Sequence, residues 1–183
     1  ATSSEAQVHY ILEDASIRYL FVGEQQQYDV AFRVMALSSN LKKIIVFDKD
    51  VKLDARDESS IFMDDFLAMG KGGKHQAEVD KRTAESQKED LMNILYTSGT
   101  TGESKGVTLT HAGYEAVMDA HCDRFPGLGE NDVVINFLPF THVFERAWSC
   151  WCLCVGAELN VNLRPQDIQM TIKEVRPTAM CSV

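Results

Sequence analysis

The sequence predicts an α/β fold with a mainly parallel sheet and flanking helices. Strand-like apolar runs alternate along the chain with segments whose apolar residues recur at helical spacing. The links between them are short, which is typical of βαβ units. The chain has 183 residues, 45% hydrophobic and 25% charged, so it can bury a sizeable core and has the composition of a soluble globular protein.

The first part of the chain, 1–69, is predicted to hold one βαβ unit preceded by a helix. Ser4 to Gln7 has the form of a capping box, which indicates where that first helix begins. The expected elements are a helix through residue 15, a strand over 18–22, a helix over 28–35, a strand over 43–47 and a short helix over 60–69.

The segment 70–90 is polar, charged and interrupted by glycines, so we interpret it as a partly mobile surface connection. It leads into a second α/β segment over 91–183. Strands are predicted there over 91–96, 107–109 and 133–138, and Thr110 can cap a helix. The expected inner face of that helix consists of Tyr114, Val117, Met118 and His121.

The string Tyr-Thr-Ser-Gly-Thr-Thr-Gly-Glu-Ser-Lys-Gly-Val over 96–107 is the most informative stretch. Its glycines free the backbone to turn N–H groups inward, its hydroxyls add donors, and Lys105 adds a positive charge. A Walker-type loop is excluded, because Gly106 and a strand-like run follow the lysine in place of Ser or Thr and a helix. The alternative is an ordinary polar hairpin with no binding role, since clusters of Gly, Ser and Thr usually mark turns. We interpret the string as a triphosphate-binding loop whose candidate residues are Thr97, Ser98, Gly99, Thr100, Thr101, Gly102, Lys105 and Gly106.

A second motif, Phe-Leu-Pro-Phe-Thr-His-Val-Phe-Glu-Arg, covers 137–146. His142 follows a predicted strand end, where functional groups of α/β proteins gather. Residues 142–155 are apolar nearly all round, which predicts a buried helix that ends at Gly156. Glu145 and Arg146 would point about 100° apart on it, so we expect two separate partners. The expected inward side holds Val143, Ala147, Cys150, Trp151 and Cys154.

Charge and cysteine spacing exclude several classes of function. The net charge of −9 argues against a nucleic-acid surface, and no apolar run approaches the roughly 18–20 residues that span a bilayer. We therefore expect at most peripheral membrane contact. Cysteines 150, 152 and 154 do not have zinc-site spacing, so we interpret all five cysteines as reduced core residues of a cytoplasmic protein.

The two motifs carry a resemblance to a known family. The 96–107 string resembles the phosphate-loop signature of the adenylate-forming (AMP-binding) superfamily, although Ser104 stands where that family commonly has proline. The 137–146 string is similar to the Leu-Pro-x-x-His-x-Phe-Glu-Arg motif of long-chain acyl-CoA synthetases. Residues 5–22 and 176–183 also resemble segments of those enzymes.

The resemblance implies an incomplete N-terminal AMP-binding domain of the acyl-CoA synthetase-like fold, with the C-terminal domain absent. The chain starts without Met and ends in a strand-like run, so we expect a piece of a larger protein. Motifs that help hold Mg²⁺ and ribose in the family lie outside the sequence, and we expect this segment alone to be inactive.

The family's reaction supplies the expected substrates and roles. A fatty-acid carboxylate attacks the α-phosphorus of Mg-ATP to give acyl-adenylate and pyrophosphate, and the CoA thiol then displaces AMP. Lys105 and His142 are the implied catalytic residues, and Thr97 is the candidate Mg²⁺ contact. Phe140, His142 and Phe144 are the implied fatty-acid contacts. The alternatives are adenylation for a carrier-protein acceptor and a non-catalytic nucleotide-binding module.

Overall fold

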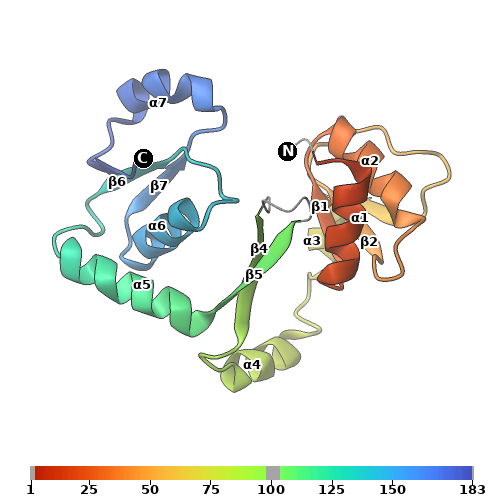
Figure 1. Cartoon of the computed structure of the whole chain (residues 1–183), viewed down its shortest axis with the longest axis horizontal. Helices are drawn as coiled ribbons and strands as arrows, with labels where there is room; N and C mark the ends of the chain where they lie inside the picture. The colour runs from red at the N-terminus through yellow and green to blue at the C-terminus, as the bar shows by residue number, and fades with distance from the viewer. Residues whose placement is uncertain (1–2, 98–103, 183) are drawn as a thin grey trace. The chain divides into compact units, whose positions relative to one another are not determined.

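The computed structural model describes residues 3–97 and 104–182, and the chain forms two compact units (Figure 1). The first unit comprises residues 1–86 and 98–106, and the second comprises 87–97 and 107–183. Each unit has a parallel sheet with helices, which confirms the predicted fold class.

The first unit contains a three-stranded parallel sheet in the order β1-β2-β3, formed by Tyr19–Val22, Lys43–Val46 and Ser60–Phe62. Helices α1 (Glu5–Asp14) and α2 (Gln25–Met35) lie side by side, and α2 contacts both β1 and β2 (Figure 1). The predicted βαβ unit is therefore present as β1-α2-β2.

Helix α1 begins with the predicted capping box. The Ser4 hydroxyl accepts the Gln7 N–H at 3.3 Å, and the Gln7 side-chain oxygen accepts the Ser4 N–H at 2.9 Å. These two bonds satisfy N–H groups that have no partner within the helix. The first turn of the chain's first helix is thus specified locally by the sequence.

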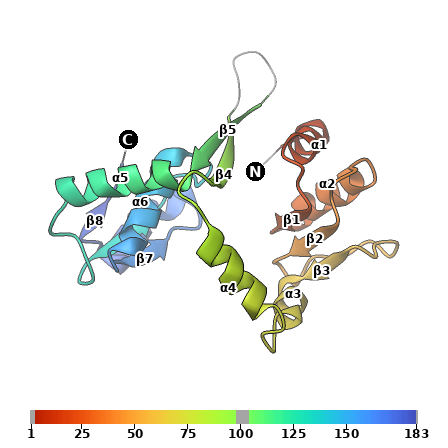
Figure 2. The same cartoon turned by 90° about the horizontal axis from the view of Figure 1, so that it is seen from below.

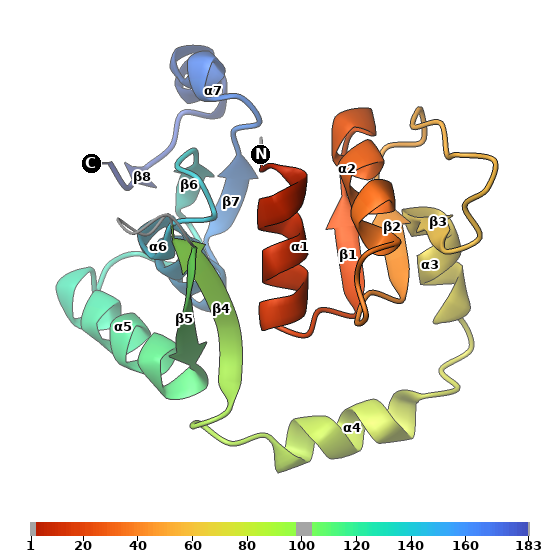
Figure 3. The same ribbon diagram turned by 45° about the vertical axis from the view of Figure 1, so that its right-hand side comes forward.

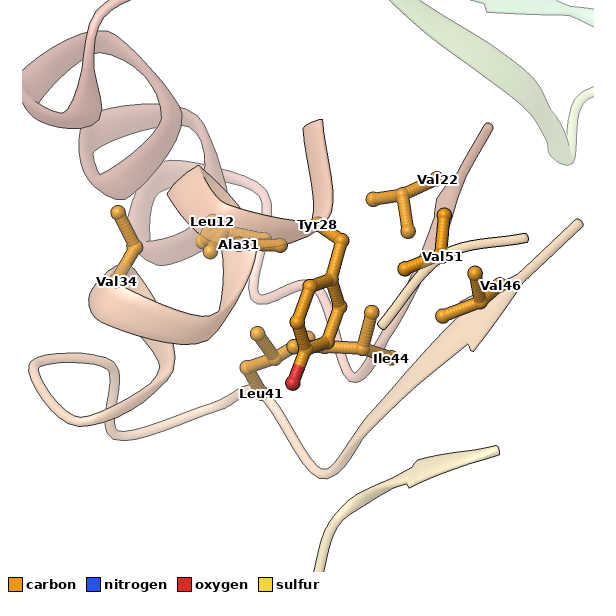
Figure 4. Packing of buried hydrophobic residues seen from close by; sticks show 9 residues of the cluster. All are labelled: Leu12, Val22, Tyr28, Ala31, Val34, Leu41, Ile44, Val46 and Val51. Carbon is orange, nitrogen blue, oxygen red and sulfur yellow. The ribbon is translucent and has the colours of Figure 1, made fainter. Parts of the chain in front are cut away.

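The core of the first unit lies between the two helices and the sheet (Figure 4). Tyr28 of α2 is only 1% exposed, and its hydroxyl donates to the Asp57 carboxylate at 2.7 Å and accepts the Asp54 N–H at 2.9 Å. Burial, followed by the hydrogen bond to Asp57, raises the pKa of Tyr28 to about 12. The other members of this core are aliphatic: Leu12, Val22, Ala31, Val34, Leu41, Ile44, Val46 and Val51.

Two predicted segments differ from the structure. Residues 60–69 are not one helix, because β3 pairs with β2 and only α3 (Met63–Met69) is helical. The 70–90 connection contains a helix, α4 (Gln76–Glu85), none of whose residues is buried (Figure 2). Side-chain pairs four residues apart support α4, including Arg82 with Glu78 at 2.7 Å. An apolar-periodicity search cannot detect a helix of that kind.

The second unit has a parallel sheet in the order β7-β6-β8, formed by Glu158–Val161, Val133–Asn136 and Ala179–Met180. Strands β4 (Leu91–Thr97) and β5 (Lys105–Thr110) form a separate two-stranded sheet and run in opposite directions (Figure 3). The helical elements of this unit are α5 (His111–Arg124), α6 (Val143–Cys154), the short 3₁₀ helix Pro165–Asp167 and α7 (Ile168–Val175).

Helix α5 begins as predicted, since the Thr110 hydroxyl accepts the Gly113 N–H at 3.3 Å. Its predicted inner face is only partly correct. Tyr114 is buried and Met118 packs on the second unit's core, but Val117 is 39% exposed. His121 lies at the rim of that core, with its ring 5.2 Å from the Trp151 ring.

Helix α6 packs against β6, β7 and α5 (Figure 1). Val143 and Cys154 are exposed, contrary to the predicted inward face. Gly156 follows the helix with φ of +83°, a left-handed conformation that suits glycine at a helix end. The side chains that α6 buries are Glu145, Ala147, Trp148, Ser149, Trp151 and Cys152.

The five cysteines are free thiols, as expected. The interpretation of all five as core residues is wrong for two of them. Cys152 and Cys181 are buried and Cys150 is half-buried, whereas Cys122 and Cys154 are exposed.

Candidate active site

The predicted phosphate-binding segment is flanked by the two expected strands. β4 ends at Thr97, β5 begins at Lys105, and the two strands pair with each other. The side chains of Thr97 and Lys105 are exposed, as is Gly106. Five further candidates, Ser98, Gly99, Thr100, Thr101 and Gly102, lie outside the described residues. Nucleotide contacts of this segment stay predictions.

His142 lies at the N-terminus of α6 and caps that helix. Its ring Nδ1 accepts the Phe144 N–H at 3.3 Å, and its own backbone N–H donates to the Pro139 carbonyl at 2.9 Å. The imidazole is exposed at the helix end where free N–H groups and the helix dipole favour negatively charged groups. The candidate site residue of the second motif is thus held by hydrogen bonds to nearby backbone groups.

A small pocket brings residues of the two motifs together. It has a volume of about 150 Å³ and lies entirely within the second unit. Thr97 contributes to it from the end of β4, and Thr141 and His142 contribute from the start of α6. Its remaining lining is apolar: Leu95, Val107, Leu109 and Val143. Residues 45 positions apart in sequence, Thr97 and His142, therefore share one concave site.

The predicted acyl contacts Phe140 and Phe144 are 42% and 40% exposed. Phe144 also lines a second pocket, of about 480 Å³, together with Trp148, which is 5% exposed. This larger pocket lies in the second unit too, and its walls are mostly apolar or aromatic. Its other lining residues include His121, Phe125, Leu128 and Met180.

Arg146 ties down the turn before α6. Its Nε and Nη2 donate to the Phe140 carbonyl oxygen at 3.1 and 2.9 Å. Glu145 has other partners, so the expectation of two separate partners for these neighbours is confirmed.

A buried polar centre around Glu145 is the feature that sequence reasoning missed. The Glu145 carboxylate is completely buried; its Oε1 accepts Asn136 Nδ2 at 2.7 Å and Ser149 Oγ at 3.1 Å. Its Oε2 accepts the Cys181 thiol at 3.3 Å. Among the residues that the structure describes, no cation forms an ion pair with it. A signal existed in the sequence, since Glu145 and Ser149 are polar residues one turn apart in a helix that is mostly apolar.

Burial, together with the Glu145 carboxylate, raises the pKa of two nearby thiols. Burial and the hydrogen bond to Glu145 raise the pKa of Cys181 to about 12. Burial and the negative charge of Glu145 raise the pKa of Cys152 to about 12 as well. Both thiols therefore stay protonated near neutral pH and are poor nucleophiles.

Residues 3–97 and 104–182 lack two features, a cluster of metal ligands and a membrane-spanning helix. In those ranges no three His, Cys, Asp or Glu side chains are grouped so that they could hold a metal ion. Across the same ranges no helix combines the length and apolar character needed to cross a bilayer.

Two solved structures share this fold. The anthranilate CoA ligase AuaEII, in complex with anthranoyl-AMP, matches with a TM-score of 0.75 at 21% identity, over 98% of this chain and 33% of that one. The N-terminal domain of FACL13 from Mycobacterium tuberculosis matches with a TM-score of 0.70 at 20% identity, over 97% of this chain and 40% of that one.

Proteins similar in sequence are named as long-chain acyl-CoA synthetases or ligases. Long chain acyl-CoA synthetase 1 of Arabidopsis thaliana is 30% identical over 199 residues, which cover 100% of this chain and 28% of that protein. Long-chain-fatty-acid–CoA ligase 1 of Saccharomyces cerevisiae is 34% identical over 143 residues, or 74% of this chain and 19% of that protein. The chain thus spans less than a third of these relatives. The family model described as AMP-binding enzyme matches residues 1–183, and the chain belongs to that family.

Proposed function

We propose that the full-length protein carrying this chain activates a long-chain fatty acid with ATP and then transfers the acyl group to CoA. The observation that carries the proposal is the pocket that joins Thr97, at the edge of the phosphate-loop string, to His142 of the second motif. The names of the acyl-CoA synthetase relatives support the substrate class. The free thiols support a cytoplasmic location.

The chemistry of adenylation is dominated by positioning and by neutralising charge on phosphates. In this proposal the string over 97–106 binds the β- and γ-phosphates, and the Lys105 ammonium stabilises the departing pyrophosphate. Mg²⁺, when bound, supplies further positive charge at the phosphates. The exposed Thr97 hydroxyl fits it as an oxygen ligand, with phosphate oxygens and water as the expected remaining ligands.

In this proposal the acyl group binds near the N-terminus of α6. His142 contacts the reacting carboxylate and adenylate, and Phe140 and Phe144 lie at the entrance for the chain. The pocket of about 480 Å³ that Phe144 and Trp148 line supports this assignment, because its walls are mostly apolar or aromatic.

ATP–pyrophosphate exchange by the full-length protein tests the proposal. Lys105→Ala should lower the fatty-acid-dependent exchange rate by roughly 10²-fold or more, because one preorganised charge at the leaving group is lost. Lys173→Ala is the matched control: it removes another exposed lysine, in α7, and should leave the rate unchanged. An unchanged rate in Lys105→Ala would remove Lys105 from the mechanism.

The acceptor and the activity of the 183-residue chain by itself are tested by separate assays. Offering CoA and acyl carrier protein as competing acceptors should yield the CoA thioester; product on the carrier alone would change the assigned acceptor. The 183-residue chain by itself should show no exchange, and exchange near the full-length rate would contradict that expectation.

A further inference from the structure

We propose that Glu145 is a positioning residue that fixes the first turn of α6, and with it the His142 imidazole, for the acyl-adenylation step. The inference rests on the proposed function for its kinetic consequence. Its structural basis is independent of that function, because it consists of hydrogen bonds and burial within the second unit.

The Glu145 carboxylate joins three separate elements. Asn136 is the last residue of β6, Ser149 lies one turn further along α6, and Cys181 directly follows β8. β6 and β8 are adjacent parallel strands, so their carboxyl ends lie at the same edge of the sheet. Glu145 therefore anchors the start of α6 to the carboxyl ends of both strands.

Because the Glu145 carboxylate and its partners Asn136 and Ser149 are buried, only one arrangement of these groups is favoured. Asn136, Glu145 and Ser149 are 3%, 0% and 1% exposed, and Asn136 Nδ2 also donates to Ser149 Oγ at 2.9 Å. A buried carboxylate is strongly penalised unless donors satisfy it, so the favoured arrangement is the one that keeps all three donors on its oxygens. Glu145 is also the third residue of α6, where the helix dipole favours a negative charge.

His142 precedes Glu145 by three residues, and the Phe144 N–H that it caps belongs to the same turn. Arg146 holds the outer side of this turn through the Phe140 carbonyl, whereas Glu145 holds its inner side. A shift of the Glu145 side chain would move the helix start relative to β6, and the imidazole would move with it. Displacement of a reacting-site group by about 1 Å can cost on the order of 10²-fold in rate.

The test uses the full-length protein with Glu145→Gln. The amide keeps the volume but places an NH₂ group where an acceptor is needed, beside either the Asn136 amide or the Cys181 thiol. We expect kcat for adenylation to fall by roughly 10- to 10²-fold while KM for ATP changes by less than about threefold. Glu158→Gln, an exposed glutamate on β7, is the matched control and should leave both constants unchanged.

Exchanging the carboxylate and the amide between positions 145 and 136 distinguishes loss of positioning of α6 from general destabilisation of the fold. Asn136→Asp combined with Glu145→Gln again places one carboxylate against one amide, with the donor and acceptor exchanged. This double variant should recover most of the lost kcat, whereas Asn136→Asp alone puts two carboxylates together and should not. Equal loss of kcat in Glu145→Gln and the double variant would overturn the positioning role.

Hydrogen exchange gives a readout that does not depend on activity. In Glu145→Gln, amides over 142–146 should exchange faster while those of β7 keep their rates. If the wild type shows no adenylation, the proposed function fails and the exchange result still decides the positioning role. An active wild type with unchanged kcat and unchanged exchange in Glu145→Gln would overturn the inference.

Cys181→Ala provides a second route if Glu145→Gln does not fold. It removes only the thiol donor on Oε2. We expect about a 3- to 10-fold loss of kcat, in line with one weak hydrogen bond, with KM for ATP preserved. An unchanged kcat in this variant would also overturn the inference.

Discussion

The central strands of the two units share one burial pattern but end differently. In β2 and in β6 the first residue is half-buried and the next three are buried. β2 ends in Val46, which packs in an aliphatic core, whereas β6 ends in Asn136, which donates to Glu145 and Ser149. The equally buried strand ends therefore differ in what surrounds them. The end of β2 packs against apolar side chains, and the end of β6 joins a hydrogen-bonded polar centre.

The difference shows where the chain buries polar groups, which costs free energy of desolvation. Among the described residues of the first unit, the buried polar groups include the Tyr28 hydroxyl, which is hydrogen-bonded to Asp57, and the Ser60 hydroxyl. The second unit buries a carboxylate, an amide and a hydroxyl at the strand end that faces the start of α6. Apolar packing would be the simpler source of stability. The polar centre instead specifies one position for the helix that carries His142.

Exchanging the two strand-end residues, Val46 and Asn136, should have the largest effect on the stability of the two units. Val46→Asn places an amide without a partner in the aliphatic core and should destabilise the first unit by about 3 kcal/mol. Asn136→Val deprives the buried Glu145 of a donor and should cost about 2 kcal/mol. Local free energies from hydrogen exchange of β2 and β6 amides would measure both. A stabilising effect of Asn136→Val would contradict the importance of the polar centre.

Alkaline pH should destabilise the first unit by ionising Tyr28. Its pKa is about 12 in the folded protein and near 10 when unfolded, so the neutral phenol is favoured by folding. The resulting stability is fully present below pH 10 and is lost as pH rises toward 12. The loss should total about 2–3 kcal/mol. Urea unfolding followed by circular dichroism, together with phenolate absorbance, would record it.

The control for this prediction is the exposed Tyr19. Tyr28→Phe should remove the late phenolate titration and the alkaline loss of stability, whereas Tyr19→Phe should retain both. A wild-type unfolding midpoint that stays constant from pH 9 to 11.5 would show that Tyr28 is not protected in the way its burial indicates.

A smaller effect is expected from the backbone at the end of α6. Gly156 has φ of +83°, and an added Cβ would lie 2.9 Å from Glu130 Cγ. Gly156→Ala should therefore cost about 1–2 kcal/mol, since a left-handed conformation strains any residue with a Cβ. Gly127→Ala is the control, because an added Cβ there meets nothing within 4 Å. Equal exchange free energies for β6 in the two variants would argue against strain at Gly156.

Local sequence patterns predicted much of this fold because they encode local causes. The capping box at Ser4, the Thr110 cap and the apolar runs of β2 and β6 each fix an element within a few residues. Helix α4 was missed because its described support comes from polar side-chain pairs on the surface, Arg82 with Glu78 and Gln76 with Asp80. Strand β3 was missed because it is defined by its pairing with β2. Periodicity of apolar residues carries neither kind of information.

The candidate site was predictable to a similar extent. The motif containing His142 indicated a group at a strand end, and the structure places it at the start of α6 beside a pocket shared with Thr97. Glu145 was missed because its partners Asn136 and Cys181 lie 9 and 36 positions away. A charged residue in an apolar helix is normally expected to face solvent. Only the tertiary structure shows that Asn136, Ser149 and Cys181 donate hydrogen bonds to Glu145 and so offset the cost of burying its carboxylate.

The cap that His142 forms also determines which hydrogen bonds its ring can offer. Because Nδ1 accepts the Phe144 N–H, the neutral imidazole must carry its proton on Nε2. The exposed nitrogen is consequently a donor and cannot abstract a proton while the cap is intact. A group bound in front of α6 would meet the Nε2–H of this ring as a hydrogen-bond donor, which suits an oxygen that gains negative charge.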